Sequence, residues 1–279
     1  MIRLSGRRYL VTGVLSGDSI AWHIAHALQL ADAEVMLTSY GRSRRITELA
    51  AADLPRPAEV LELDASRPED FPLLASAVGE RWQCLDGVVH AIAGAPPDAI
   101  GGTFLTAPAQ SAEAAFRTSA VSLHALATAL SPLLVRSPGR GSVVGLDFDA
   151  SVAWPGYDWM GVAKAALESV CRYLALYLGP QGIRVNLVAT GPVETVSGRG
   201  VSTFEALNRR WEHDAPLGWN SAAAAADVVV GPVLFLLSEL ARGITGEVIH
   251  ADGGMRGAGM GLAARDDHDL ATDRATKGS

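Results

Sequence analysis

The sequence predicts a single α/β domain in which a doubly wound parallel sheet of about seven strands carries helices on both faces. Short, nearly continuous apolar runs alternate with longer helical patterns along most of the chain. This alternation is typical of parallel strands that are buried on both faces and joined by crossover helices. The 279 residues contain no internal repeat and no interior linker, and one doubly wound domain of about 250 residues accounts for most of that length.

The strands are expected where apolar and β-branched residues form short runs. In chain order they span residues 8–12, 34–38, 59–63, 86–92, 142–146, 184–189 and 247–251. The helices are expected where apolar residues recur with a period of about 3.6. They span residues 20–30, 44–52, 69–78, 111–134, 160–178 and 226–238.

Residues 1–256 are expected to form this domain, and two segments depart from its pattern. Residues 195–213 carry glycines and polar positions between a strand and a helix, where a mobile substrate lid is expected. Residues 257–279 lose the apolar period and end in a polar run, so we expect a disordered C-terminal tail there.

Composition and charge exclude several classes of protein. The chain is 49% hydrophobic and 19% charged, which excludes disorder as its main state. A net charge of −7 argues against a nucleic-acid partner, because phosphate binding needs a clustered excess of Lys and Arg. No apolar run reaches the roughly 18 residues that a membrane span needs. Cys84 and Cys171 form no pairing motif, so we expect a cytoplasmic protein.

No metal site is expected. His23 and His26 lie three residues apart on a helix, a spacing that could bind a metal, but no third ligand lies nearby in the sequence. His90 falls inside an expected buried strand and is expected to pack there.

The turn after the first strand suggests a Rossmann-type dinucleotide site. Gly13 follows the strand, and Ser19 precedes the first helix. Glycine lets the backbone approach a ligand, and the N-terminus of a helix offers unpaired N–H groups to a pyrophosphate. The usual G-x-G-x-x-G pattern is absent, so an ordinary turn with Ser19 as helix cap remains the alternative at this point.

The segment after the second strand leaves the choice between NADH and NADPH open. Many NAD-specific sites have Asp or Glu at this point, and the stretch from Thr38 to Gly41 has neither. Tyr40 could stack on the adenosine, and Arg42 or Arg44 could reach a 2′-phosphate. Asp64, after the third strand, is a candidate adenine contact, and a turn-forming Asp is the alternative.

Tyr157 and Lys164 lie seven residues apart at the start of the long helix expected near residues 160–178. Seven helical steps of about 100° bring two side chains to nearly the same face, about 10 Å apart along the axis. A tyrosine hydroxyl can donate a hydrogen bond to an oxyanion, and a nearby ammonium can hold ribose hydroxyls and lower the tyrosine pKa. Read as isolated residues, a surface lysine and a half-buried tyrosine are the alternative.

Together these motifs resemble the short-chain dehydrogenase/reductase superfamily and, within it, the enoyl-acyl-carrier-protein reductases. Six residues separate Tyr157 from Lys164, as in the enoyl reductases, whereas most of the superfamily has three. The first turn also resembles the enoyl-reductase form, and the similarity covers residues 3–256. The other matching stretches are residues 85–93, 186–195 and 245–254, and residues 153–161 and 216–219 resemble actinobacterial members.

The wider spacing has a chemical reason. In ketone reduction the hydride reaches the carbonyl carbon, beside the oxygen that must be stabilised. In reduction of a trans-2-enoyl thioester it reaches Cβ, two bonds further away, so the tyrosine must lie further from the nicotinamide. Changing the spacing from four to seven residues adds about 4.5 Å along a helix, which disfavours a ketoreductase.

The resemblance implies a role for each matching residue. Tyr157 would hydrogen-bond the thioester carbonyl and stabilise the enolate, Lys164 would hold the nicotinamide ribose, and Phe148 would orient the substrate. Tyr40 would lie at the adenosine. The other cofactor contacts would be Gly13, Val14, Ser19, Ile20, Asp64, Ala65, Ala91, Ile92, Ala93, Thr118, Leu146, Gly191, Pro192, Val193 and Thr195. Ala91, Thr118 and Glu194 depart from the residues that are common in the family.

The implied function is an enoyl-acyl-carrier-protein reductase of fatty-acid biosynthesis that uses NADH, with NADPH as the alternative cofactor. The substrate would be a trans-2-enoyl group linked to acyl carrier protein or coenzyme A, and the resemblance implies a homotetramer. Two alternatives stay open: a reductase of a secondary-metabolite or polyketide pathway, and a catalytically idle dinucleotide-binding regulatory protein. On the expected lid, Trp211 could line an acyl pocket, and Arg199, Arg209 and Arg210 could dock the acidic carrier protein.

Overall fold

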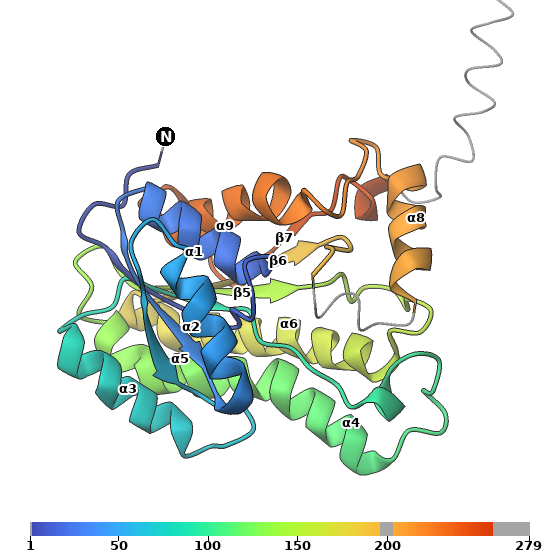
Figure 1. Cartoon of the computed structure of the whole chain (residues 1–279), viewed down its shortest axis with the longest axis horizontal. Coiled ribbons are helices and arrows are strands. Elements are labelled where there is room, and N and C mark those ends of the chain that lie inside the picture. Colours follow the sequence, from blue (N-terminus) through green and yellow to red (C-terminus); the bar gives the residue numbers. More distant parts are fainter. Residues whose placement is uncertain (1, 196–202, 259–279) are drawn as a thin grey trace, which may run out of the picture.

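Seven parallel strands form one sheet at the centre of the protein (Figure 1), which is described here from a computed structural model for residues 2–195 and 203–258. The strand order is β3-β2-β1-β4-β5-β6-β7, and every pairing is parallel. The strands are β1 (Arg8–Val11), β2 (Glu34–Ser39), β3 (Glu59–Glu62), β4 (Gly87–His90), β5 (Ser142–Asp147), β6 (Arg184–Thr190) and β7 (Val248–Ala251).

Helices cover both faces of this sheet (Figure 1). One apolar core joins the sheet to α1 (Ile20–Leu30), α2 (Arg44–Ala52) and α9 (Val230–Leu237). A second core joins its other face to α3 (Asp70–Arg81), α5 (Ser122–Leu134) and α6 (Asp158–Leu178). Successive side chains of a strand point to opposite faces, so Val11 packs in the first core and Leu10 in the second.

The predicted fold class is confirmed, and all seven expected strands are present with ends within two residues of the prediction. Residues 109–134, however, do not form one regular helix. They divide into α4 (Ala109–Phe116), a π-helical turn (Arg117–Val121) and α5. A second π-helical turn, Ala225–Val229, precedes α9. The periodicity of apolar residues does not predict such a turn, because a π-helical turn is a rare, single-turn irregularity within an otherwise regular α-helix.

The two segments that depart from the pattern are described only in part. Of the expected lid, residues 196–202 lie outside the described residues, whereas α8 (Phe204–Asp214) is a helix that buries Leu207 and Trp211. Residues 259–279 of the expected disordered tail also lie outside the described residues. The lid and the tail therefore stay predictions.

The strand order reverses between β1 and β4, and this reversal determines where a ligand can bind. The chain runs outward from β1 through β2 to β3 and then returns to place β4 on the other side of β1. The crossovers on the two sides of this point lie on opposite faces, so a crevice opens beyond the carboxyl ends of β1 and β4. Ligands of doubly wound α/β proteins bind in such a crevice.

Two further observations concern membranes and metals. No helix within residues 2–195 and 203–258 combines the length and apolar character that crossing a bilayer requires. In that same part of the chain, no three or more His, Cys, Asp or Glu side chains are placed to hold a metal ion. His23 and His26 pack against Trp22, with ring centroids 5.3 and 5.1 Å from it.

His90, the last residue of β4, is packed in the core, as predicted. Its side chain is fully buried, and Nε2 lies 2.8 Å from the Ser122 hydroxyl. Burial, with a smaller contribution from the charge of the nearby Lys164, lowers the pKa of His90 to about 3. The unfolded chain binds a proton at His90 near pH 6.5, whereas the folded chain does not.

The stability that His90 contributes is therefore present above pH 6.5 and is lost as the pH falls toward 3. We expect the free energy of unfolding of the wild type to fall by about 2 kcal/mol more than that of His90→Asn between pH 7 and pH 5. Denaturant unfolding at the two pH values measures this difference. His213→Asn, which replaces a largely exposed imidazole, is the control and should change the slope far less. Equal slopes for wild type and His90→Asn would contradict the assignment.

Candidate active site

Two neighbouring cavities occupy the crevice at the carboxyl ends of the strands. One, of about 340 Å³, lies beyond β1, β2 and β3, and the other, of about 430 Å³, lies beyond β5 and β6. The segment after β4, Ala91 to Gly94, lines both cavities. They therefore form one continuous site, and their shared wall lies at the reversal of strand order.

Gly13, which follows β1, packs closely against the backbone of Ala91, which follows β4. Its φ is +83°, and a Cβ at this position would overlap the carbonyl group of Ala91. The backbone therefore fits here only without a side chain. Ser19 occupies the N-cap position of α1, as the alternative reading had it, but its side chain makes no cap hydrogen bond. Its hydroxyl accepts hydrogen bonds from the N–H groups of Leu15 and Ser16, both at 3.0 Å, and so holds the turn itself.

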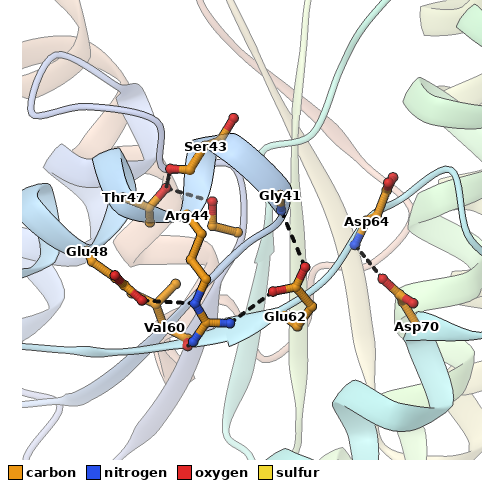
Figure 2. Close-up of polar contacts among 10 residues, drawn as sticks. Gly41, Ser43, Arg44, Thr47, Glu48, Val60, Glu62, Asp64 and Asp70 are labelled. Atoms are coloured by element: carbon orange, nitrogen blue, oxygen red, sulfur yellow. Dashed lines mark hydrogen bonds and ion pairs between the residues drawn. The ribbon is translucent and has the colours of Figure 1, made fainter.

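A polar cluster lies beside the adenosine end of the expected site (Figure 2). The Arg44 guanidinium donates to Glu48, Glu62 and the carbonyl of Val60, each at 2.9 Å. Glu62 also accepts a hydrogen bond from the backbone of Gly41 at 3.4 Å. Arg44 is thus held along the edge strand β3 by two carboxylates and does not line the cavity.

Tyr40 and Asp64 both line the smaller cavity, as expected of adenosine contacts. Asp64 also has the alternative role considered for it, because its Oδ1 accepts hydrogen bonds from the N–H and hydroxyl of Ser66. The backbone of Asp64 is fixed in turn by a hydrogen bond to Asp70 at 2.9 Å (Figure 2). Asp64 therefore forms a turn and faces the cavity at once.

Lys164 lies at the bottom of the larger cavity and is 5% exposed. Its ammonium donates to the carbonyl of Leu146 at 2.8 Å and lies 3.8 Å from Asp147 Oδ1. Burial lowers the pKa of Lys164, and the charge of Asp147 opposes that shift. Burial likewise raises the pKa of Asp147 to about 7, against the effect of Lys164. Sequence reasoning missed Asp147, although an acidic residue ending an apolar strand was a usable signal.

Tyr157 immediately precedes α6 and lines the same cavity as Lys164. Its ring lies 5.0 Å from that of Phe148 between centroids. Burial raises the pKa of Tyr157, and the charge of Asp147 adds to the shift. Tyr157 has an αR backbone and its carbonyl accepts the N–H of Gly161 at 3.4 Å, so the hydrogen bonding of α6 begins at Tyr157. The φ of +47° at Asp158 departs from regular helix at the first step between Tyr157 and Lys164.

An aromatic cluster closes the site behind Phe148. The ring centroids of Phe148 and Trp211 are 5.5 Å apart, and those of Trp154 and Trp211 are 4.8 Å apart. Trp211 is 1% exposed and packs behind Phe148, so the α8 side chains that line the cavity are Phe204 and Leu207. The predicted lining role of Trp211 is thus taken by its neighbours on the same helix.

Tyr157, Lys164, Phe148 and all the cofactor contacts that the family resemblance implies line the two cavities or a third, of about 100 Å³, beside Gly13 and Ser19. These residues therefore lie where a bound ligand would contact them, and their individual roles stay predictions. Arg42, Arg44 and Trp211 line none of the three. The lining residues that the sequence analysis did not name are Leu15, Ala21, Thr38, Ser39, Leu63, Ser66, Gly94, Ala95, Ile100, Asp147, Met160, Thr190, Phe204 and Leu207. Most of them offer backbone or apolar surface, which carries little signal in a sequence.

Glu194 and the described arginines of the expected lid, Arg209 and Arg210, line neither of the two cavities. The Glu194 side chain is exposed, and its backbone N–H donates to the carbonyl of Ser221 at 3.0 Å. Arg209 and Arg210 lie near carboxylates of their own helix, Glu205 at 3.7 Å and Asp214 at 3.4 Å. Arg199 lies outside the described residues. On α8, the two arginines are thus offset by carboxylates and do not form a basic patch for a carrier protein.

The fold and the crevice define a Rossmann-type α/β protein with its site at the point where the strand order reverses. The chain belongs to the enoyl-(acyl carrier protein) reductase family, whose model matches residues 13–256. A protein of Mycolicibacterium smegmatis named enoyl-(acyl-carrier-protein) reductase (NADH) is 40% identical over 90% of this chain and 96% of its own length. A protein of the same name from Escherichia coli is 35% identical over 92% of this chain and 97% of its own.

Replacing Gly13 by Ala is expected to weaken NADH binding, because the added Cβ would collide with Ala91 and the φ of +83° disfavours any side chain. Gly17→Ala, in the same turn, is the matched control, since no atom lies within 4 Å of its added Cβ. Fluorescence titration with NADH should show affinity near the wild type for Gly17→Ala and at least a tenfold loss for Gly13→Ala, about 1.4 kcal/mol. Wild-type affinity in Gly13→Ala would contradict the importance of this close approach.

Proposed function

We propose that this protein is an NADH-dependent enoyl-acyl-carrier-protein reductase of fatty-acid biosynthesis. The observation that carries the proposal is that Tyr157 and Lys164 line one cavity at the crevice that fits a dinucleotide. Two named relatives with this activity align over nearly their whole length. A catalytically idle protein is not favoured, because both side chains face the cavity.

Tyr157 acts as the hydrogen-bond donor to the thioester carbonyl. Its raised pKa keeps the hydroxyl protonated, so it is available to donate as negative charge develops on that oxygen. The low exposure of its surroundings strengthens the interaction, because water competes little there. Phe148 packs against the Tyr157 ring and offers an apolar wall for the acyl chain.

Lys164 holds the nicotinamide ribose, since its ammonium is fixed by the Leu146 carbonyl and lies near Asp147. NADH, when bound, supplies the hydride that adds to Cβ of the enoyl thioester and is itself oxidised to NAD⁺. The electron pair of the double bond would move onto the thioester oxygen as an enolate, which would then take a proton at Cα from solvent water. The protein contributes orientation of the thioester and stabilisation of the charge on its oxygen.

Preference for NADH over NADPH is supported by the polar cluster of Figure 2. Of the two arginines that could reach a 2′-phosphate, Arg44 is engaged by Glu48 and Glu62, whereas Arg42 is exposed in the turn after β2. Glu62 adds negative charge beside Gly41, where a 2′-phosphate would be repelled.

The roles of the two side chains are tested by Tyr157→Phe and Lys164→Ala. We expect Tyr157→Phe to lower kcat about 100-fold or more with little change in the Kd for NADH, because it removes an oxyanion donor. Lys164→Ala is expected to weaken NADH binding as well. Oxidation of NADH with crotonyl thioester, followed by absorbance, measures turnover. Activity on 3-ketoacyl thioesters with none on enoyl thioesters would contradict the proposed activity. Wild-type rates in both variants would contradict the roles of Tyr157 and Lys164.

A homo-oligomer, a homotetramer by family resemblance, is supported by an apolar groove of about 590 Å³ on the outer face of α5 and α6. Tyr173 and Tyr177 on this groove are 62% and 70% exposed, and exposed apolar surface that gathers in one place is typical of protein–protein contacts. The groove is lined by Phe116, Val121, His124, Thr128, Ala166, Ser169, Val170, Tyr173, Leu174, Tyr177 and Leu178.

A cytoplasmic location is supported by the free thiols of Cys84 and Cys171.

Replacing Tyr177 by Glu is expected to lower the oligomeric mass, because a carboxylate would be buried in the interface. Light scattering coupled to gel filtration should show the wild type as an oligomer and the variant as smaller species. Leu105→Glu is the control, since Leu105 is 94% exposed and lies outside the groove. A monomeric wild type at micromolar concentration would refute the oligomer.

A further inference from the structure

The loop after β4 is tied to the start of α6 on both sides of Tyr157. The backbone N–H of Gly101 donates to the carbonyl of Gly156 at 2.8 Å. The N–H groups of Gly102 and Thr103 donate to one carboxylate oxygen of Asp158, at 2.6 and 2.9 Å. Three hydrogen bonds therefore join this loop to the two neighbours of Tyr157.

The backbone on both sides of Tyr157 adopts conformations that most residues avoid. Gly156 has φ of +73° and Asp158 has φ of +47°, and in the loop Gly102 has φ of +94°. A left-handed conformation is costly for a residue with a side chain, although Asp and Asn tolerate it best. Such strain persists where other contacts hold the backbone, and it concentrates at functional sites. The two hydrogen bonds to Asp158 provide that restraint.

The tied loop forms part of the wall of the larger cavity. Ile100 and Tyr157 both line it. The hydroxyl of Thr103 donates to the carbonyl of Asp98 at 2.9 Å, so the loop is also braced internally. Further along, Phe104 stacks on Trp159 with ring centroids 5.2 Å apart. The loop and the start of α6 therefore pack as one unit around Tyr157.

We propose that Asp158 is a positioning residue, whose carboxylate holds the Gly101–Thr103 loop against the start of α6 and thereby fixes Tyr157 and Ile100 together around the thioester carbonyl. A carboxylate that accepts two N–H groups makes charge-assisted hydrogen bonds, which are stronger than neutral ones. Small displacements of a group that must meet a reacting atom are costly to the rate. This inference rests on the role proposed above for Tyr157.

The test compares Asp158→Ala, Asp158→Gly and Asp158→Asn with the wild type. Ala and Gly both remove the carboxylate that accepts the two hydrogen bonds. Gly also adopts the left-handed backbone without cost, so a loss of kcat that both variants share is due to the missing hydrogen bonds. We expect kcat for crotonyl thioester to fall about 10- to 100-fold in both, with the Kd for NADH within twofold of the wild type. Asn keeps an acceptor oxygen and tolerates the backbone, so Asp158→Asn should restore most of kcat.

Hydrogen exchange gives a readout that does not need activity. The amides of Gly102 and Thr103 should exchange faster in Asp158→Ala and Asp158→Gly than in the wild type and in Asp158→Asn. Asp98→Asn, which neutralises an exposed carboxylate of the same loop outside the cavity, is the control and should leave both kcat and exchange unchanged.

Two results would overturn the positioning role. One is wild-type kcat in Asp158→Ala and Asp158→Gly, and the other is an equal loss in Asp158→Asn and Asp158→Ala. A wild type with no enoyl reductase activity would instead refute the proposed function. The exchange rates would then still decide whether Asp158 holds the loop.

Discussion

The close approach of the backbone at Gly13 to that of Ala91 is the constraint on which the site depends. These residues follow β1 and β4, the two central strands between which the strand order reverses. A Cβ at position 13 would overlap the Ala91 carbonyl, so the two segments can pack in contact only because residue 13 is glycine. The cavity lined by Tyr40 and the cavity lined by Tyr157 share the residues Ala91–Gly94 of this packed segment. A side chain at position 13 would therefore displace a wall that both cavities share.

The polar groups at the two ends of this crevice are held by different physical means. At the exposed end, Arg44 is surrounded by carboxylates in a network that solvent screens. At the other end, Lys164 and Asp147 are buried. Burial lowers the pKa of Lys164 and raises that of Asp147, so it favours the neutral form of each side chain. The Lys164 side chain is held by its hydrogen bond to the Leu146 carbonyl. Burial and one hydrogen bond thus fix the polar groups at this end of the crevice, whereas exposed ion pairs fix those at the other end.

Sequence reasoning located the strands well because their apolar runs are buried on both faces and leave a strong pattern. It located the glycine turn, Tyr157 and Lys164 through motif spacing. It did not find the π-helical turn Arg117–Val121, since such a turn is a rare, single-turn irregularity within an otherwise regular α-helix. It also missed Asp147 and Ile100, which reach the cavity only because β5 and the loop after β4 end beside each other.

The sequence by itself determined the fold class, the order of elements and the identity of the residues that can do the chemistry, because periodicity and residue type are local properties. Only the tertiary structure decided how these residues meet. The backbone at Asp158 has φ of +47°, which no local pattern predicts, and the Asp158 carboxylate accepts hydrogen bonds from Gly102 and Thr103 of a distant loop. The engagement of Arg44 by Glu62 likewise joins residues from α2 and β3. Contacts between distant segments arise from packing, which a linear pattern does not record.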